Sequence, residues 1–452
     1  MQSNGQQSAP WKQWRRVLVV GLGKTGLSCA RYLSARGLEV AITDSRMQPP
    51  ALEAVREWLP DAALFLGGFA AEAFAAADAV VVSPGVSLRE PLLAQALEQG
   101  TPVLGDVDLF AAEAGAPVVA VTGSNGKSTV TTLVGEMARH AGRRVGVGGN
   151  LGTPLLELLD PALELYVIEL SSFQLETAHA LNASAAVVLN ISEDHMDRYG
   201  DPAEYRAAKE RIYRGDGVMV INSDDPQVVA MVLPGRRSIT FTLGTPKADG
   251  YGLGQRAGGR WLMRGRQPVL GVDELRMAGR HNVANALAAL ALGEAVGLPL
   301  EPMVAALREF PGLPHRCQFV AEIAGVAWYN DSKATNVGAA VAALEGFERP
   351  LILIAGGDAK GADLTPLQAP VERHARAVVL LGRDAPRLAE TLGQCVPLHR
   401  VESVEEAVRV AVSLARSGDA VLLAPACASL DMFRNFEERG DRFTAAVRGL
   451  AP

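Results

Sequence analysis

The chain has 452 residues, of which 48% are hydrophobic and 21% charged, and its formal net charge is −7 at pH 7. This length predicts two to four domains, and the acidic balance excludes the broad basic surface needed to bind nucleic acid or an anionic membrane. Because the four cysteines lack zinc-site spacing and no run of about eighteen apolar residues occurs, we expect a cytoplasmic protein with reduced thiols and no membrane insertion.

The first predicted unit opens with a strand, a glycine-rich turn and a helix. Arg15 to Val20 lead into the turn Gly21-Leu22-Gly23-Lys24-Thr25-Gly26, and a second strand ends at Asp44. This order is the phosphate-binding fingerprint of a Rossmann unit, and a purely structural tight turn is the alternative. The turn recognises a diphosphate rather than a base, so it does not identify the nucleotide. Asp44 could contact a ribose or a base.

Two further strands complete this unit. Residues 79–82 end in the loop Ser83-Pro84-Gly85, and residues 102–106 form the last strand. Since ligands of parallel α/β sheets bind beside the carboxyl ends of strands, the Ser83–Gly85 loop is a candidate contact. We place the first domain boundary at residue 106, followed by an alanine- and glycine-rich linker at 111–117.

A second phosphate loop is the clearest signal in the chain. The apolar strand 118–122 runs into Gly123-Ser124-Asn125-Gly126-Lys127-Ser128-Thr129 and then into a helical segment. The glycines let backbone N–H groups and the helix N-terminus face one anion, Lys127 neutralises the β/γ-phosphates, and the Ser128 hydroxyl suits Mg²⁺. Val121 replaces the usual first glycine, so the loop is a shortened variant; a turn that merely carries lysine and serine is the alternative.

Acidic residues follow the next two predicted strands. Glu169 ends the strand 165–169, where an acid in a nucleotide-binding sheet commonly faces Mg²⁺ directly or through water. Three acids and a histidine follow the strand 186–191: Glu193, Asp194, His195 and Asp197. We expect a site role for His195 beside the nucleotide loop, against the alternatives of a structural histidine and, for Glu169, a solvated strand end.

The second half of this region changes character twice. Residues 205–213, with Lys209, have the mixed charge typical of a solvated helix face. Residues 236–277 contain short alternating segments, among them 238–242 and 261–263, which predict an antiparallel side sheet.

The chain then continues with a helix and a third unit. The helix that opens at Gly279 places Asn282 and Asn285 on one face, where two amides could read an adenine edge or simply cap the helix. The breaker cluster 311–316 marks the second boundary. Four further strands separated by helical segments predict a third doubly wound α/β domain: 326–330, 350–355, 377–381 and 420–424.

With these segments in place, the chain resembles the Mur ligase family from about residue 17 onward. Seven blocks carry the resemblance: Thr122–Thr129, Glu169–Glu176, Asn190–Tyr199, Gly279–Asn285, Gly312–Arg316, Asn330–Asn336 and Ser417–Gly440. Several such blocks in order are more specific than any one of them, and the shortened phosphate loop is the family's own. The leader before Trp14 lies outside the resemblance.

The resemblance implies three α/β domains. Residues 1–106 would form an N-terminal Rossmann-like domain that binds a UDP-substrate. Residues 107–312 would form a central ATPase domain with a parallel sheet and a small antiparallel side sheet. Residues 313–452 would form a C-terminal Rossmann-like domain that closes over ATP and D-glutamate.

Carried over by position, the resemblance also implies sets of site residues. The UDP-substrate would contact Gly23, Lys24, Thr25, Asp44, Ser45, Arg46, Ser83, Pro84, Gly85 and Asn150. ATP would contact Gly123, Ser124, Asn125, Gly126, Lys127, Ser128, Thr129, Asn282, Asn285, Arg316 and Asp331. D-Glutamate would contact His315, Lys333, Thr335, Ser429, Leu430 and Phe436. The implied catalytic residues are Lys127, Glu169, His195 and Lys209.

Two Mg²⁺ ions are expected, one at Ser128 and Glu169 and a second near His195 and Lys209. An ammonium would repel a metal ion, so a lysine fits the second site only if its charge is inverted. We therefore predict that the neutral Lys209 amine reacts with CO₂ to give a carbamate, an anionic oxygen ligand of the kind Mg²⁺ prefers.

The implied activity is an ATP-dependent amide ligase that adds D-glutamate to UDP-N-acetylmuramoyl-L-alanine through an acyl phosphate, in peptidoglycan precursor synthesis. We expect a monomer with no nucleic-acid partner. One alternative is a nicotinamide-dependent oxidoreductase, which rests on Gly21–Gly26 and Asp44 but leaves the second phosphate loop unexplained. The others are a Mur-type or folylpolyglutamate-type ligase with a different acceptor, and a regulatory nucleotide-binding protein.

Overall fold

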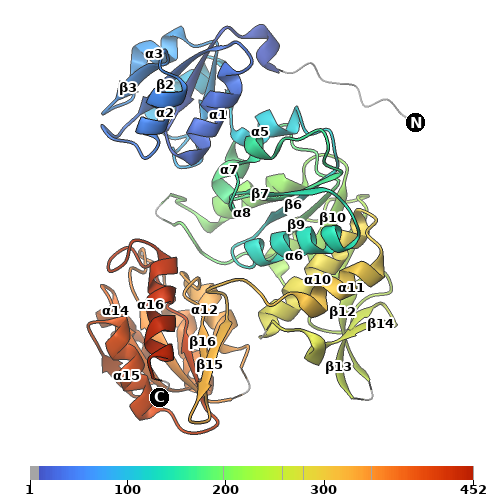
Figure 1. Cartoon of the computed structure of the whole chain (residues 1–452), viewed down its shortest axis with the longest axis vertical. Coiled ribbons are helices and arrows are strands. Elements are labelled where there is room, and N and C mark those ends of the chain that lie inside the picture. The colour runs from blue at the N-terminus through green and yellow to red at the C-terminus, as the bar shows by residue number, and fades with distance from the viewer. Residues whose placement is uncertain (1–9, 197, 257, 278, 348, 451–452) are drawn as a thin grey trace.

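The computed structural model describes residues 10–196, 198–256, 258–277, 279–347 and 349–450. Asp197 of the predicted histidine loop and the first nine residues of the leader lie outside these ranges. Three α/β domains follow one another along the longest axis of the molecule, each built on its own sheet (Figure 1). Across these ranges, no helix has both the length and the apolar character needed to cross a membrane.

The N-terminal domain has a five-stranded parallel sheet with the order β3-β2-β1-β4-β5. Its strands are β1 (Arg16–Val20), β2 (Glu39–Asp44), β3 (Ala63–Leu66), β4 (Ala79–Val82) and β5 (Val103–Leu104). Its helices are α1 (Lys24–Ser34), α2 (Leu52–Trp58), α3 (Ala71–Ala76) and α4 (Pro91–Glu98). The predicted strand–turn–helix–strand unit is confirmed as β1, α1 and β2.

The middle domain has a nine-stranded sheet with the order β14-β13-β12-β11-β10-β9-β6-β8-β7. Its strands are β6 (Val118–Thr122), β7 (Val145–Gly149), β8 (Leu165–Glu169), β9 (Ala185–Val188), β10 (Val218–Asn222), β11 (Ser238–Phe241), β12 (Tyr251–Arg256), β13 (Gly259–Arg264) and β14 (Gln267–Gly271). Its helices are α5 (Asp106–Ala111), α6 (Lys127–His140), α7 (Ser172–Glu176), α8 (Pro202–Glu210), α9 (Pro226–Val229), α10 (Arg280–Ala295) and α11 (Leu300–Glu309). Helix α10 is apolar around most of its circumference because it packs between α6, α11 and the sheet.

The antiparallel segment expected in residues 236–277 is present as β12, β13 and β14. These strands extend the main sheet at its edge, and β11 joins β10 in parallel rather than belonging to the antiparallel part. In β11, which lies between β10 and β12, Ser238 is exposed and Ile239 and Phe241 are buried. A parallel strand can therefore carry the same alternating pattern as an antiparallel one.

The C-terminal domain has a six-stranded sheet with the order β15-β16-β20-β17-β18-β19, in which only the β15–β16 pair is antiparallel among the described strands. Its strands are β15 (Gln318–Ile323), β16 (Val326–Asn330), β17 (Leu351–Gly356), β18 (Ala375–Leu381), β19 (Leu398–Arg400) and β20 (Ala420–Leu423). Its helices are α12 (Val337–Leu344), α13 (Gln368–His374), α14 (Ala385–Leu392), α15 (Val404–Leu414) and α16 (Phe436–Arg448). Apolar clusters fill both faces of this sheet.

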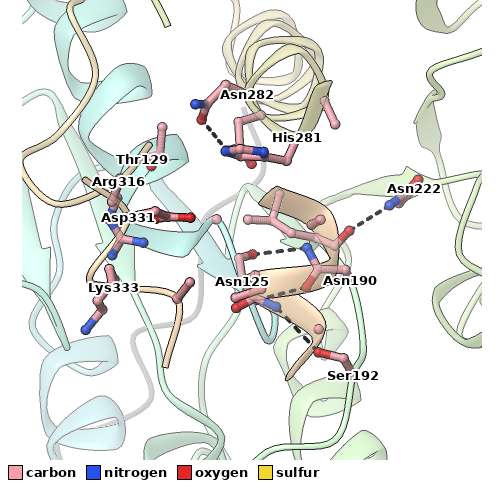
Figure 2. Close-up of a pocket in the computed structure, with 18 of the residues that line it drawn as sticks. Asn125, Thr129, Asn190, Ser192, Asn222, His281, Asn282, Arg316, Asp331 and Lys333 are labelled. Atoms are coloured by element: carbon pink, nitrogen blue, oxygen red, sulfur yellow. Dashed lines mark hydrogen bonds between the residues drawn. The ribbon is translucent and has the colours of Figure 1, made fainter. Parts of the chain in front are cut away.

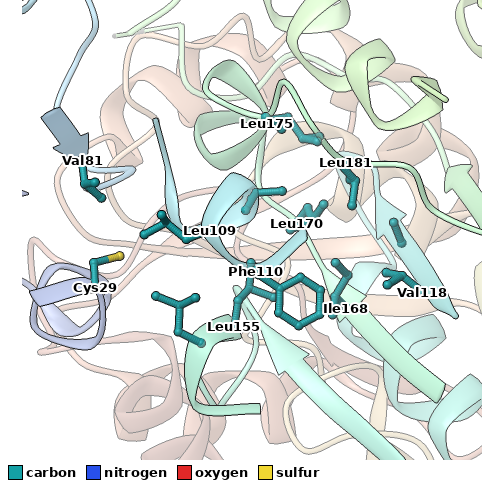
Figure 3. Packing of buried hydrophobic residues seen from close by; sticks show 14 of the residues in the cluster. Cys29, Val81, Leu109, Phe110, Val118, Leu155, Ile168, Leu170, Leu175 and Leu181 are labelled. Carbon is teal, nitrogen blue, oxygen red and sulfur yellow. The ribbon is translucent and has the colours of Figure 1, made fainter. Parts of the chain in front are cut away.

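One hydrophobic cluster is shared by the N-terminal and middle domains. Figure 3 shows Leu109 and Phe110 of α5 between Cys29 of the N-terminal domain and Ile168 of the middle domain. All four side chains are at most 1% exposed. The segment that links the two sheets is therefore itself part of a common core.

Candidate active site

The phosphate loop connects β6 to α6 at the centre of the middle sheet. Gly126 is the N-cap residue of α6 with φ 85°, and Gly123 has φ 149°. A Cβ atom on Gly123 would lie 3.0 Å from the Cβ atom and 3.1 Å from the backbone nitrogen of Leu189. Both the backbone angle and the space thus require glycine at 123, as expected for a loop that cradles an anion.

Lys127 lies at the start of α6 and turns back over the loop. Its ammonium donates to the carbonyl oxygens of Gly123 at 2.8 Å and Ser124 at 2.9 Å. Burial lowers the pKa of Lys127, while the nearby carboxylates of Glu169 and Asp194 act in the opposite direction. The ammonium is therefore already held over the loop in which a polyphosphate would bind.

Glu169 ends β8 next to this loop and is 2% exposed. Its Oε1 atom accepts a hydrogen bond from the Asn150 amide at 2.6 Å, and its Oε2 atom is buried without a hydrogen-bond partner. A buried carboxylate oxygen without a partner is costly, so this atom fits a bound cation. No group of three or more His, Cys, Asp and Glu side chains suited to a metal occurs in the described ranges.

The loop after β9 brings Asp194 and His195 to the same place. His195 has φ 58°, and its ring lies 4.8 Å from that of Phe173. Asp194 accepts a hydrogen bond from Asn336 at 3.3 Å and lies 3.9 Å from the Lys360 ammonium. Asn336 and Lys360 belong to the C-terminal domain, so this loop is where the two domains meet.

Lys209 is 1% exposed, so its sequence-based assignment to a solvated helix face is wrong. The mixed charge of this helix belongs to its other residues, because α8 turns Lys209 toward the phosphate loop. The Lys209 amine donates to the Gly123 carbonyl at 2.9 Å and lies 4.7 Å from the centre of the Tyr205 ring. Burial and the nearby charge of Lys127 lower the pKa of Lys209 well below its ordinary value.

These residues line one cavity of about 290 Å³. Its lining includes Ser124, Asn125, Gly126, Lys127, Ser128, Asn150, Glu169, Asp194, His195, Lys209, Arg316, Lys333, Thr335, Asn336 and Lys360. All four implied catalytic residues are among them. Sequence reasoning missed Lys360 and Asn336, although a lysine in the glycine-rich loop after the strand 350–355 was a usable signal.

A second cavity of about 250 Å³ adjoins the first and shares Asn125, Gly126, Arg316 and Lys333 with it. Figure 2 shows Asn282 of α10 on one side of this cavity and Arg316 and Asp331 on another. Gly279 is the N-cap residue of α10, and the Asn285 amide donates to the Asn282 side-chain oxygen at 3.1 Å. The two cavities together suit a nucleotide, with its base beside α10 and its phosphates on the loop.

Arg316 connects the C-terminal domain to the phosphate loop, and Asp331 lines the second cavity with it. The Arg316 guanidinium donates to the Ser128 hydroxyl at 2.7 Å, and Asp331 accepts from the Cys317 amide at 3.2 Å. Burial raises the pKa of Asp331 to about 7, although the Cys317 hydrogen bond and the Arg316 charge lower it. The ionised Asp331 carboxylate in this cavity therefore lowers the free energy of unfolding.

We expect Asp331→Asn to stabilise the ligand-free protein at pH 8 and to have little effect near pH 4. An unfolded aspartate has a pKa of about 3.9. Because the folded-state pKa is raised, the fold loses stability as the pH rises from about 4 through about 7, where a buried carboxylate must be ionised. Thermal melting of both proteins across this pH range checks the prediction, and an equal difference at all pH values would contradict it.

The N-terminal loops expected to hold the UDP-substrate lie at the carboxyl edge of their sheet. The Ser83 hydroxyl donates to the Gly21 carbonyl at 2.7 Å, and the Lys24 ammonium donates to Gly152 of the middle domain at 2.6 Å. The Asp44 carboxylate accepts from the Leu22 amide at 2.7 Å and pairs with Arg46 at 2.7 Å. Burial would raise the pKa of Asp44, but Arg46 and the Leu22 amide hold it at about 2.

Asp44 therefore supports the glycine turn from within, and Gly23, Thr25, Ser45, Pro84 and Gly85 remain the expected contacts around it. Asn150 lies apart from the other residues expected to contact the UDP-substrate, because it lines the catalytic cavity beside Glu169.

The residues expected to meet D-glutamate divide into two groups. Lys333 and Thr335 line the catalytic cavity, and burial lowers the pKa of Lys333 to about 8, helped by the charges of Arg316 and Lys127. His315, Ser429, Leu430 and Phe436 line neither cavity. Phe436 still contacts the site through Lys333, whose ammonium lies 3.8 Å from its ring centre. Leu430 is 72% exposed.

Comparisons with known proteins cover each of the three domains. The family described as Mur ligase MurD-like, N-terminal domain, matches residues 15–105. The Mur ligase middle domain matches residues 121–293, and the Mur ligase glutamate ligase domain matches residues 315–427.

Individual relatives are similar over the same length. A UDP-N-acetylmuramoylalanine–D-glutamate ligase of Nitrosococcus oceani is 59% identical, with 96% of each chain covered. One of Pseudomonas aeruginosa is 56% identical over 96% of this chain and 98% of its own. The solved UDP-N-acetylmuramate-alanine ligase of Thermotoga maritima shares the fold, with a TM-score of 0.59, 20% identity and coverage of 97% and 100%.

Proposed function

The chain belongs to the Mur ligase family, and on that premise we propose that it joins D-glutamate to UDP-N-acetylmuramoyl-L-alanine at the expense of ATP, in peptidoglycan precursor synthesis. The observation that carries the proposal is the single cavity in which the phosphate loop, the unpartnered Glu169 oxygen and cations from the middle and C-terminal domains meet. The proposed domains comprise residues 1–106, 107–312 and 313–452. The enzyme acts as a cytoplasmic monomer.

The chemistry explains why the site is rich in cations and has no protein nucleophile. A carboxylate does not form an amide at neutral pH, because it repels an amine and its oxygen is a poor leaving group. The lactoyl-L-alanine carboxylate therefore takes the γ-phosphoryl group of ATP, and the D-glutamate amine displaces phosphate from the acyl phosphate through a tetrahedral oxyanion. The protein's part is to align the reactants and neutralise charge.

Lys127 and the phosphate loop at the N-terminus of α6 hold the polyphosphate, and Arg316 and Asn282 hold the remainder of ATP. Mg²⁺ supplies charge neutralisation on the phosphates, and Ser128 and Glu169 are the side chains that would hold the first ion. A second Mg²⁺ ion would be held by His195 and by the carbamate of Lys209.

D-Glutamate carries two carboxylates, and three cations of the C-terminal domain line the cavity. Arg316 is bonded to Ser128, so Lys333 and Lys360 would receive the carboxylates, with Thr335 in the same lining. Ser429, Leu430 and Phe436 join the substrate when the C-terminal domain closes.

Small-angle scattering should show compaction on adding an ATP analogue with the UDP-substrate, and an unchanged radius of gyration at saturation would argue for a preformed site.

The proposed function is tested by phosphate release from ATP with each substrate omitted in turn. Release should require both UDP-N-acetylmuramoyl-L-alanine and D-glutamate, and the product should contain the new amide bond. Equal release with L-glutamate or with another amino acid would redirect the proposal to a ligase with a different acceptor specificity. Release without either substrate would contradict it.

A further inference from the structure

We propose that Arg198 is an interdomain positioning residue, which fixes the UDP-substrate loop of the N-terminal domain against the catalytic loop of the middle domain. The inference rests on the proposed function for its kinetic part only. Arg198 follows the His195 segment in the chain and lines neither of the two cavities.

The guanidinium of Arg198 reaches across the domain boundary. Its Nη1 atom donates to the Pro84 carbonyl at 2.8 Å, and its Nη2 atom donates to the Val86 carbonyl at 3.1 Å. The same Nη2 atom donates to the Glu176 carboxylate at 2.6 Å. The Arg198 and Glu176 side chains are only 12% and 15% exposed, so solvent screens this ion pair far less than a surface pair.

On the middle-domain side, Arg198 belongs to a connected set of side chains that ends at the catalytic cavity. Glu176 also accepts a hydrogen bond from the Tyr199 hydroxyl at 2.5 Å. The guanidinium lies 4.1 Å from the centre of the Phe173 ring, and that ring contacts the His195 ring. One side chain therefore links the loop after β4 with the residues that support His195.

The shared hydrophobic cluster holds the two domains together, but it constrains their relative orientation less than the Arg198 hydrogen bonds do. Apolar burial is non-directional, whereas a guanidinium with three bonded acceptors fixes both distance and angle. The cluster also lies around α5, while Arg198 acts beside the Ser83–Gly85 loop. The hydrogen bonds thus add a directional constraint where the substrate would pass between the domains.

This constraint matters because the substrate spans both domains. Its UDP end would bind at the N-terminal loops, and its carboxylate must reach the γ-phosphate of ATP in the middle domain. A displacement of about 1 Å between reacting groups can cost about a hundredfold in rate. Holding the two loops in register therefore presents the carboxylate to ATP without any contact between Arg198 and the reacting atoms.

The chain offers a matched control at the same boundary. Arg89 forms an interdomain ion pair with Glu204 at 2.7 Å, but these side chains are 64% and 46% exposed. An exposed pair of this kind contributes little to stability or orientation. Arg89→Met therefore removes an interdomain arginine without removing the buried constraint.

The physical test measures domain orientation directly, without any assay of activity. Spin labels are placed at Leu97→Cys and Val229→Cys, two exposed helical positions in different domains, in a Cys395→Ser background whose other cysteines are buried. We expect Arg198→Met to broaden or shift the distance distribution, and Arg89→Met to leave it as in the otherwise unchanged protein. An unchanged distribution in Arg198→Met would overturn the proposal.

The kinetic test asks which substrate the constraint serves. Arg198→Met should lower kcat by about tenfold or more and also raise the KM for the UDP-substrate, while the KM for ATP changes by less than about twofold. Arg198→Lys can keep the ion pair with Glu176 but not both carbonyl bonds, so its KM should stay raised. A fully active lysine variant, or an equal change in both KM values, would overturn the assignment.

The two tests separate this inference from the proposed function. If the unaltered protein forms no amide with D-glutamate, the proposed function fails while the distance measurement still decides the role of Arg198. If Arg198→Met shifts the distances but leaves the KM for the UDP-substrate unchanged, the contact orients the domains without positioning substrate, and the proposal is overturned.

Discussion

Lys127→Ala should lower ligase turnover by at least about a hundredfold without unfolding the chain, and Glu169→Ala should do the same. The Lys127 ammonium is held over the phosphate loop by two of the loop's own carbonyls, and Glu169 has a buried oxygen without a hydrogen-bond partner. Both groups are costly to bury and serve phosphate and metal rather than packing. Their removal should therefore leave the melting temperature unchanged or raise it.

Steady-state turnover and thermal melting of each variant check this expectation. Lys247→Ala is the matched control, because Lys247 is an exposed lysine of the middle domain outside both cavities. Retention of a tenth of the rate by either site variant would remove that residue from its assigned role. A large fall in melting temperature would instead show that the side chain supports the fold.

Lys209→Ala should lose most activity, and millimolar acetate or formate should restore part of it. Burial and the nearby charge of Lys127 lower the pKa of the Lys209 amine, which raises the fraction in the neutral form that attacks CO₂. The nitrogen bonds to the CO₂ carbon and a proton is released, which leaves an anionic carbamate suited to Mg²⁺. A small carboxylate can replace that group in the space left by alanine.

Lys209→Arg should remain inactive in the same assay, because a guanidinium keeps its charge and forms no carbamate. Activity of the unaltered enzyme should fall as the pH drops through the lowered pKa of Lys209, because protonation removes the nucleophilic amine. Labelled bicarbonate should be retained by the unaltered protein and not by the alanine variant. Normal turnover of the arginine variant would show that carbamylation plays no part.

Local sequence order predicted part of each of the three sheets, although β3, β7, β10, β15 and β19 were not among the predicted strands. A strand followed by a glycine turn and a helix is a short-range pattern, so β1–α1 and β6–α6 were identified together with the loops between them. The assignment of Glu169 to the edge of the nucleotide-binding sheet also followed from one strand and its last residue. The structure places these residues beside the phosphate loop because β8 pairs with β6 in parallel.

What the sequence could not indicate depends on contacts between distant segments. Lys209 has the sequence surroundings of a solvated helix face, and only the packing of α8 against the phosphate loop buries it. Lys360 enters the cavity from another domain, and β11 alternates like an antiparallel strand although it pairs in parallel. For Lys209 and Lys360 the deciding partner lies far away along the chain, and for β11 it is the pairing with β10, which periodicity does not indicate.

The hydrophobic cluster around α5 has a further consequence for how the protein loses its structure on heating. Because Leu109 and Phe110 pack against both adjoining sheets, we expect the N-terminal and middle domains to melt as one cooperative unit in calorimetry. The C-terminal domain has two clusters of its own, so we expect it to melt in a separate transition. An excised N-terminal domain would expose apolar surface and aggregate, whereas a fragment that begins near residue 315 would remain an independent folding unit.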